Sequence, residues 1–103
     1  LGMGDDGHTA SLFPTTSALQ ETKRIAVNNW VEKYDANRLT LTYPAINNAS
    51  NIFFMVSGEE KAEALREVLK GEKNFEKFPS QKIKPIKGKI TWLIESEAGE
   101  FIK

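Results

Sequence analysis

The chain has 103 residues, 40% of them hydrophobic and 27% charged, so its length and composition predict one globular domain with its own core. Fourteen basic residues balance 14 acidic ones, which leaves none of the positive excess that proteins use to bind nucleic acids, and no apolar run approaches the ~20 residues of a membrane span. The absence of cysteine excludes disulfides and thiolate chemistry and leads us to expect a cytoplasmic protein.

The beginning of the chain is rich in glycine and predicts a loop. Residues 1–8 are turn-forming, and residues 9–13 are compatible with a single helical turn before Pro14 interrupts it. A loop of this type normally follows a strand that directs it, so we expect a strand before Leu1 in the intact protein. Residues 1–103 would then form one partial domain.

The middle of the chain predicts two short strands. Residues 24–27 read as the first strand, and residues 28–37 as a connection. Residues 38–42 alternate strictly between leucine and polar side chains, which indicates a second strand with one polar face. Pro44 suits the first turn of a short helix that ends near Ala49.

The later part of the chain predicts a strand, a helix and a second strand. Residues 52–56 are apolar without alternation, which is typical of a strand covered on both faces. A Ser-x-x-Glu capping box at Ser57 then begins a helix over residues 58–70, and residues 90–94 form a final strand before a short helical tail. This order predicts an α/β fold with a layered parallel sheet.

The glycine loop satisfies a nucleotide-binding pattern but lacks its context. Gly2 to Gly7 match G-x-G-x-x-G, which in dinucleotide-binding proteins precedes a full helix and, one strand later, an acidic residue. Here Pro14 prevents a long helix, and no acidic residue follows the strand that ends at Val27. We therefore do not expect a nucleotide cofactor.

His8 is the only histidine and the strongest candidate for proton transfer. An imidazole accepts protons near neutral pH, and the flexible glycines bring backbone N–H groups close to a ligand. Asp6 lies close enough in the sequence to fix the tautomer of the ring. The alternative is a surface loop in which the glycines make turns, the aspartates cap a short helix, and His8 is incidental.

The longer string from Leu1 to Pro14 favours a functional site. It reads Leu-Gly-Met-Gly-Asp-Asp-Gly-His-Thr-Ala-Ser-Leu-Phe-Pro and resembles the signature of the 6-phosphogluconolactonases. The related glucosamine-6-phosphate isomerases share Gly-x-Gly-x-Asp-Gly-His but continue with Ile-Ala-Phe-Asn-Glu-Pro. This chain lacks the acidic residue of that continuation, so the resemblance favours the lactonases over the isomerases.

Three later segments resemble the same family in the same order. They are Arg38 to Thr42, Gly58 to Ala62, and Trp92 to Ile94, the last followed by Glu95 where an aspartate is more usual. The resemblance implies a three-layer, Rossmann-like α/β fold of the NagB type with a parallel sheet, of which this chain is the C-terminal half. The family's other half, with its own phosphate-binding loop and an arginine, is absent from the sequence.

The resemblance also implies an activity and roles for particular residues. The expected reaction is hydrolysis of 6-phosphoglucono-δ-lactone to 6-phosphogluconate in the pentose phosphate pathway, without a metal or other cofactor. His8 would be the general base, oriented by Asp6, and loop amides of Gly4 and Gly7 would bind the developing oxyanion. Lys61, in the first turn of its helix, would hold the substrate phosphate.

Several alternatives stay open. Lys61 could point to solvent with its charge offset by neighbouring glutamates, and Arg38 could bind a phosphate or carboxylate or pair with a nearby acidic residue. The whole chain could have isomerase or deaminase activity, or could bind a sugar phosphate without turning it over. The sequence does not predict an oligomeric state.

Overall fold

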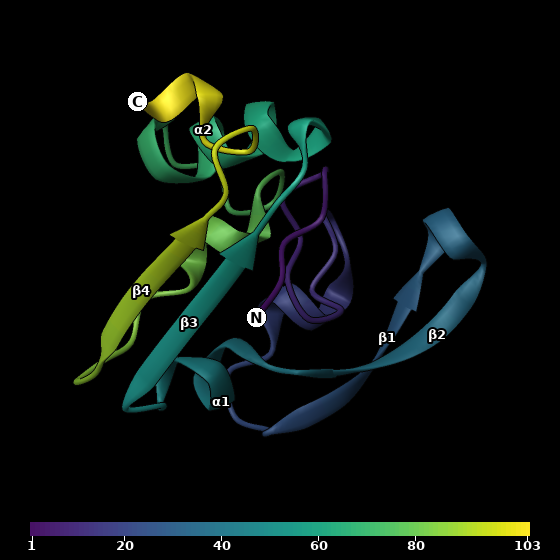
Figure 1. Cartoon of the computed structure of the whole chain (residues 1–103). Helices are drawn as coiled ribbons and strands as arrows, with labels where there is room; N and C mark the ends of the chain where they lie inside the picture. The colour runs from purple at the N-terminus through teal and green to yellow at the C-terminus, as the bar shows by residue number, and fades with distance from the viewer.

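The computed structural model describes residues 1–103 and contains two small sheets, each of two strands (Figure 1). The strands are β1 (Ala26–Val31), β2 (Ala36–Leu41), β3 (Asn51–Val56) and β4 (Lys89–Ile94). The α-helices are α1 (Tyr43–Asn47) and α2 (Ala62–Lys70). The 3-10 helices are η1 (Ser17–Gln20), η2 (Glu32–Tyr34), η3 (Glu59–Lys61), η4 (Pro79–Lys82) and η5 (Glu100–Ile102). None of the helices has the length and apolar character needed to cross a membrane.

The β3–α2–β4 unit has the α/β organisation that the sequence predicts. β3 and β4 are parallel, and Phe54 lies opposite Trp92, with the two rings stacked 4.0 Å apart. Parallel strands require a crossover connection, which α2 and the following loop provide. The buried side of α2 packs with the inner face of β3 in one core cluster, which includes Ile52, Phe54, Val56, Ala64, Leu65 and Val68.

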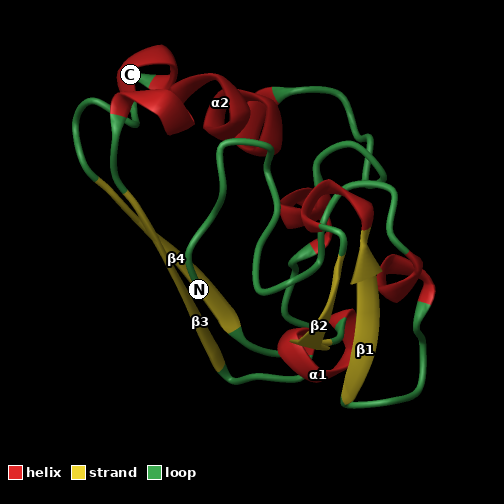
Figure 2. Cartoon of the chain, turned by 90° about the vertical axis from the view of Figure 1, so that its right-hand side faces the viewer, coloured by secondary structure: helices red, strands yellow, loops and turns green.

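β3 is covered on one face only, contrary to the expectation of a strand buried on both faces. Its side chains alternate strictly between buried and exposed, and those of Phe53 and Met55 are 52% and 68% exposed. Figure 2 shows the helices and loops of the chain on one side of the β3–β4 pair. The unbroken apolar sequence of β3 therefore leaves an uncovered hydrophobic face.

The segment before α2 is organised by Glu95 and not by the predicted capping box. The side chain of Ser57 caps nothing, and the chain turns at Gly58, whose φ of +103° favours glycine. The Glu95 carboxylate accepts hydrogen bonds from the amides of Gly58, Glu97 and Ala98 at 2.9–3.1 Å. These hydrogen bonds lower the pKa of Glu95 below its ordinary value and join the ends of β3 and β4.

β1 and β2 form one antiparallel hairpin that projects away from the β3–β4 sheet (Figure 1). The first strand was predicted at residues 24–27, but it begins two residues later and runs through Val31. Residues 28–31, which were expected to form a connection, belong to this strand. The hairpin closes through η2 and Asp35, which has a left-handed φ of +48° that aspartate tolerates. The second strand was predicted nearly correctly.

The polar face of the hairpin points into the protein. Asn29 and Thr40 are buried on the inner face, whereas Leu39 on the outer face is 83% exposed. The inner face packs against the irregular segment from Ser11 to Ala18, whose backbone groups have few partners of their own. Polar side chains are needed there because buried backbone groups require hydrogen bonds.

Asn29 makes three hydrogen bonds across this interface. Its fully buried side-chain amide accepts a hydrogen bond from the backbone of Ala18 at 3.1 Å. The same side chain donates to the carbonyl of Ser11 and to the hydroxyl of Thr16, each at 2.9 Å. Asn29 thus connects β1 to both ends of the irregular segment.

We expect Asn29→Ala to lower the free energy of unfolding by about 2–4 kcal/mol, because it removes three hydrogen bonds and leaves the buried amide of Ala18 and the part-buried carbonyl of Ser11 without these partners. Denaturant unfolding of the chain measures the change. Asn28→Ala is the matched control, since Asn28 lies on the outer face and bonds only to the exposed Asn37. Equal destabilisation by the two substitutions would contradict the role of Asn29.

Candidate active site

The glycine loop is held closed by its own backbone. The amide of Gly4 donates to the carbonyl of His8 at 2.9 Å, and the amide of Gly7 donates to the carbonyl of Gly4 at 3.0 Å. Gly7 has a φ of +82°, and a Cβ there would also crowd Phe78. The loop is therefore a preformed turn that fixes the position of His8.

The helical turn predicted for residues 9–13 does not form. Thr9 and Leu12 instead form an isolated antiparallel bridge, with the amide of Leu12 donating to the carbonyl of Thr9 at 2.9 Å. Ala10 has a left-handed φ of +52°, which is incompatible with a right-handed helix. This tight turn brings Phe13 back toward His8.

His8 and Asp6 form the closest polar pair of the site. Nδ1 of His8 lies 2.5 Å from Oδ1 of Asp6, and the backbone amide of His8 donates to the same oxygen at 3.1 Å. An ionised carboxylate can only accept, so Nδ1 carries the proton and Nε2 presents its lone pair. Nε2 has no hydrogen-bond partner in the protein and is free to accept a proton from a ligand or water.

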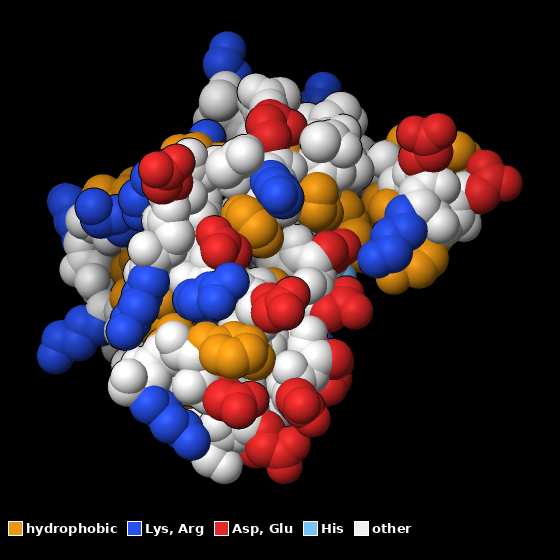
Figure 3. All heavy atoms as spheres, turned by 90° about the horizontal axis from the view of Figure 1, so that it is seen from above, with side chains coloured by type: hydrophobic (Ala, Val, Ile, Leu, Met, Phe, Trp, Pro, Cys, Tyr) orange, Lys and Arg blue, Asp and Glu red, His pale blue; other side chains and the backbone are white.

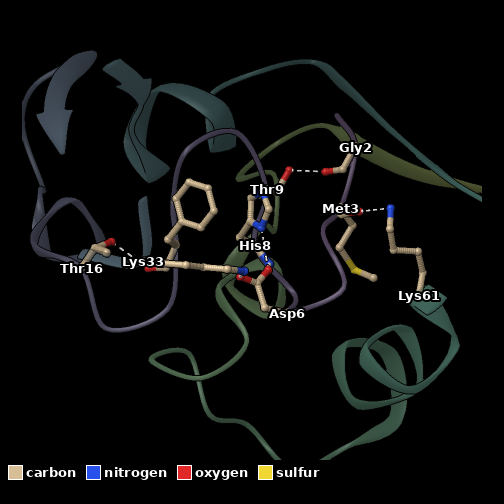
Figure 4. Close-up of polar contacts among 9 residues, drawn as sticks. Gly2, Met3, Asp6, His8, Thr9, Thr16, Lys33 and Lys61 are labelled. Carbon is tan, nitrogen blue, oxygen red and sulfur yellow. Dashed lines mark hydrogen bonds and ion pairs between the residues drawn. The ribbon is translucent and has the colours of Figure 1, made fainter. Parts of the chain in front are cut away.

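Lys33 completes the environment of Asp6. Its ammonium lies 3.4 Å from Oδ2 of Asp6, the carboxylate oxygen that His8 does not use (Figure 4). Partial burial acts to raise the pKa of Asp6, but hydrogen bonds from His8 and the charge of Lys33 outweigh it. The pKa of Asp6 therefore lies below its ordinary value of 3.8, so the carboxylate is ionised at neutral pH.

The lowered pKa of Asp6 predicts a pH-dependent contribution to stability. The folded chain binds this proton more weakly than the unfolded chain, so the stabilisation is complete above the ordinary value and disappears as pH falls through the folded pKa. We expect the difference in unfolding free energy between the wild type and Asp6→Asn to be largest near ~pH 6 and to shrink toward ~pH 2.5. Denaturant unfolding over this range measures it, and a constant difference would contradict the prediction.

The His8 ring is held between the loop and Phe13. A Cβ at Gly4 would overlap the ring, so only glycine leaves room for it. The ring stacks on Phe13 with centroids 4.0 Å apart and an angle of 26° between the planes. The His8 side chain is 22% exposed, and its visible edge lies where the projecting hairpin meets the main body (Figure 3).

Lys61 contacts the same loop from another direction. It ends η3, and its ammonium donates to the carbonyl of Met3 at 2.7 Å. In Figure 4, Met3 lies between Lys61 and His8. One donor of the ammonium is therefore bound to the loop backbone, and two are available to a ligand.

Arg38 has neither an acidic nor a backbone partner. Its guanidinium carbon lies 4.7 Å from the centre of the Tyr34 ring, in a cation–π arrangement at the tip of the hairpin. Tyr34 in turn meets the edge of Phe13, with centroids 5.5 Å apart. The structure therefore connects Arg38 to His8 through two aromatic rings, an arrangement that the sequence did not predict.

The sequence analysis missed Lys33 and Phe13 as neighbours of the pair. Lys33 is 27 positions from Asp6, and its approach depends on the hairpin, which was read as a connection. Phe13 belongs to the recognised string, but its contact with His8 depends on the tight turn at Ala10. A correct hairpin prediction would have placed Lys33 at the tip but not beside Asp6, because that contact joins segments 27 positions apart.

A surface cavity adjoins the pair through Phe13 and Lys33. Its volume is about 500 Å³, and it lies between the segment from Phe13 to Ser17 and the hairpin from Trp30 to Lys33. Neither His8 nor Lys61 lines it. No group of three or more histidine, aspartate or glutamate side chains is arranged to hold a metal ion.

The sequence and the fold of this chain are similar to those of known proteins. The sequence profile described as glucosamine-6-phosphate isomerases/6-phosphogluconolactonase matches residues 1–92. The chain belongs to this family. The match includes the loop, Lys61 and most of β4, so the resemblance stated from the sequence is confirmed at the level of the family.

Two bacterial 6-phosphogluconolactonases are similar to this chain over nearly its whole length. The 6-phosphogluconolactonase of Synechocystis sp. is 44% identical over 104 residues, which cover 100% of this chain and 42% of the relative. The 6-phosphogluconolactonase of Nostoc sp. is 46% identical over 100 residues, or 96% of this chain and 40% of the relative. Among solved structures, the 6-phosphogluconolactonase of Leishmania guyanensis matches with a TM-score of 0.85 and 27% identity, covering 100% of this chain and 40% of that one. The chain thus spans about two fifths of the length of the relatives it matches.

Proposed function

We propose that this chain contributes the catalytic histidine of an enzyme that hydrolyses 6-phosphoglucono-δ-lactone to 6-phosphogluconate. The observation that carries the proposal is the Asp6–His8 pair, which leaves Nε2 unpartnered inside the loop that carries the family's signature. The names of the Synechocystis and Nostoc relatives support the choice of reaction. We further propose a cytoplasmic enzyme of sugar-phosphate metabolism.

His8 acts first as a base and then as an acid. Nε2 takes a proton from water while the water oxygen attacks the lactone carbonyl and forms a tetrahedral oxyanion. The bond between the carbonyl carbon and the ring oxygen then breaks, and the imidazolium returns the proton to the leaving oxygen. Asp6 keeps the proton on Nδ1 and stabilises the transient positive charge of the ring. The product carboxylic acid ionises in solvent.

Backbone amides of the loop stabilise the oxyanion. The amides of Gly4 and Gly7 already donate within the loop, whereas those of Asp5 and Asp6 have no partner in the protein. We assign the oxyanion contacts to Asp5 and Asp6, and to Gly4 and Gly7 the role of shaping the turn. Amides that point at a developing negative charge accelerate acyl transfer strongly in a water-poor site.

We propose that the complete site and a three-layer fold involve further chain, because these residues span about two fifths of the length of the relatives. Leu1 accepts a hydrogen bond from Met55 at 2.9 Å and donates to Phe53 at 2.7 Å, along the edge of β3 opposite β4. We propose that this edge continues as a larger parallel sheet, in which further elements cover the exposed face of β3. The same elements would complete the walls between His8 and Lys61.

A chimera tests the proposed function. This chain replaces its counterpart in the Synechocystis lactonase, and hydrolysis of 6-phosphoglucono-δ-lactone is measured above the uncatalysed rate, with the unmodified relative as reference. We expect turnover within about tenfold of the reference, since the two sequences are 44% identical. Binding of the lactone without turnover, or conversion of glucosamine 6-phosphate in its place, would overturn the proposal.

We expect Lys61→Ala in the chimera to raise KM about tenfold or more, because a charged hydrogen bond to the substrate phosphate is lost. The value of kcat should change much less, since the phosphate lies far from the reacting carbon. Lys73→Ala is the control, because Lys73 is an exposed lysine on the loop after α2. An unchanged KM would reject Lys61 as the phosphate ligand and leave only its contact with Met3.

A further inference from the structure

We propose that Lys33 and Phe13 are positioning residues. Lys33 orients the Asp6 carboxylate and Phe13 orients the His8 ring, so the tip of the β1–β2 hairpin contributes to the geometry of the active site. Their effect on catalysis rests on the proposed function. Their effect on the geometry of His8 does not, and it can be measured without any substrate.

Lys33 prevents the Asp6 carboxylate from rotating. Oδ1 of Asp6 receives both the ring and the backbone amide of His8, and Oδ2 receives the ammonium of Lys33. Each carboxylate oxygen thus has its own donor, and the two donors come from segments 27 positions apart. Without Lys33, Oδ2 would face solvent, and the carboxylate could turn away from Nδ1.

Phe13 restricts the tilt of the His8 ring. The hydrogen bond to Asp6 fixes Nδ1, but it still allows the imidazole to tilt about that bond. Stacking on Phe13 at 4.0 Å opposes this tilt. Phe13 is itself buried, and the edge of its ring rests on Tyr34.

The hairpin tip acts on both restraints, because it supplies Lys33 and contacts Phe13 through Tyr34. Lys33 and Tyr34 are consecutive residues of η2, and the Tyr34 ring is also covered by the Arg38 guanidinium at 4.7 Å. The ammonium of Lys33 lies 5.5 Å from the centre of the same ring. A movement of the tip would therefore alter the contacts of Asp6 and Phe13 together.

The test uses the full chain labelled with ¹⁵N in histidine, where His8 gives the only imidazole signals. The two ring-nitrogen shifts report which nitrogen carries the proton, and the ring-proton shifts report stacking on an aromatic neighbour. Lys33→Met removes the charge but keeps an apolar stem, and Lys33→Arg should restore the contact. We expect Lys33→Met to reduce the population with the proton on Nδ1 and Lys33→Arg to keep it.

Three further variants complete the spectroscopic test. Phe13→Leu should shift the His8 ring protons away from their stacked positions, whereas Phe53→Leu, at an exposed site of β3, should not. Lys87→Met repeats the charge change at an exposed lysine and should leave the His8 signals as in the wild type. Wild-type His8 spectra in both Lys33→Met and Phe13→Leu would overturn the proposal. If Phe13→Leu fails to fold, the His8 spectrum of Lys33→Met alone tests the proposal. That variant should fold, because the Lys33 side chain is 53% exposed and lies outside the core.

Kinetics in the chimera separate positioning from the proposed function. We expect Lys33→Met to lower kcat about two- to fivefold with little change in KM, the size that a part-exposed ion pair supports. A change confined to KM would overturn the positioning role. An inactive chimera with altered His8 spectra would refute the lactonase proposal and leave the positioning of the ring intact.

Discussion

His8→Gln in the chimera is expected to reduce kcat for lactone hydrolysis about a hundredfold to ten-thousandfold. Glutamine keeps a planar polar side chain of similar reach, but it cannot take a proton from water. The residual rate should reflect the oxyanion contacts and substrate binding that the variant retains. A continuous assay of lactone disappearance, corrected for spontaneous hydrolysis, measures the change.

The control for His8→Gln must separate lost chemistry from a collapsed loop. The carbonyl of His8 accepts the Gly4 amide and should still do so in the variant, because that bond involves only the backbone. Denaturant unfolding of the 103-residue chain should therefore give a similar midpoint with and without the substitution. Turnover at the wild-type rate would remove His8 from the mechanism.

Gly4→Ala is expected to lower kcat about a hundredfold without removing any catalytic group. The added methyl group would occupy the space of the His8 ring and would also crowd Oδ1 of Asp6. Either the ring or the loop must move, and displacements near 1 Å at a catalytic base have effects of this size. The His8 imidazole signals of the full chain should shift along with the loss of activity.

Gly2→Ala is the matched control for Gly4→Ala. It adds the same methyl group to the same loop, but a Cβ at Gly2 meets no other atom within 4 Å. We expect its activity and its His8 signals to remain close to those of the wild type. Equal losses in the two variants would indicate a general loosening of the loop and would contradict the specific contact at Gly4.

The features predicted well from the sequence depend on local patterns. Asp6 and His8 are two positions apart, so a tight glycine turn is sufficient to bring them together. The strand at residues 52–56 was recognised because it is a continuous apolar run, and the strand at residues 90–94 because it is rich in β-branched and aromatic residues. Burial of β3 was overestimated, since an apolar run indicates that both faces can be covered but not whether this chain covers them.

The features predicted poorly depend on contacts between distant segments. Asn28 and Asn29 disfavour strands by propensity, so β1 was cut short and the hairpin was missed. The buried role of Asn29 arises from its hydrogen bonds to Ser11, Thr16 and Ala18, which no local pattern reveals. Lys61 and Arg38 were chosen from the family resemblance. Their roles toward a ligand stay predictions, and the structure gives Met3 and Tyr34 as their present partners.

The inward-facing Asn29 and Thr40 of the hairpin help to set the register of its two strands. A shift of one residue in strand pairing would turn Asn29 outward and bring Trp30 toward the segment that carries Phe13. The same shift would also turn outward Val31, which is only 1% exposed in the native pairing, so hydrogen bonding and hydrophobic burial select the same register. The register of the hairpin is therefore coupled to the position of residues 11–18, and a disturbance of that segment would reach both strands of the hairpin.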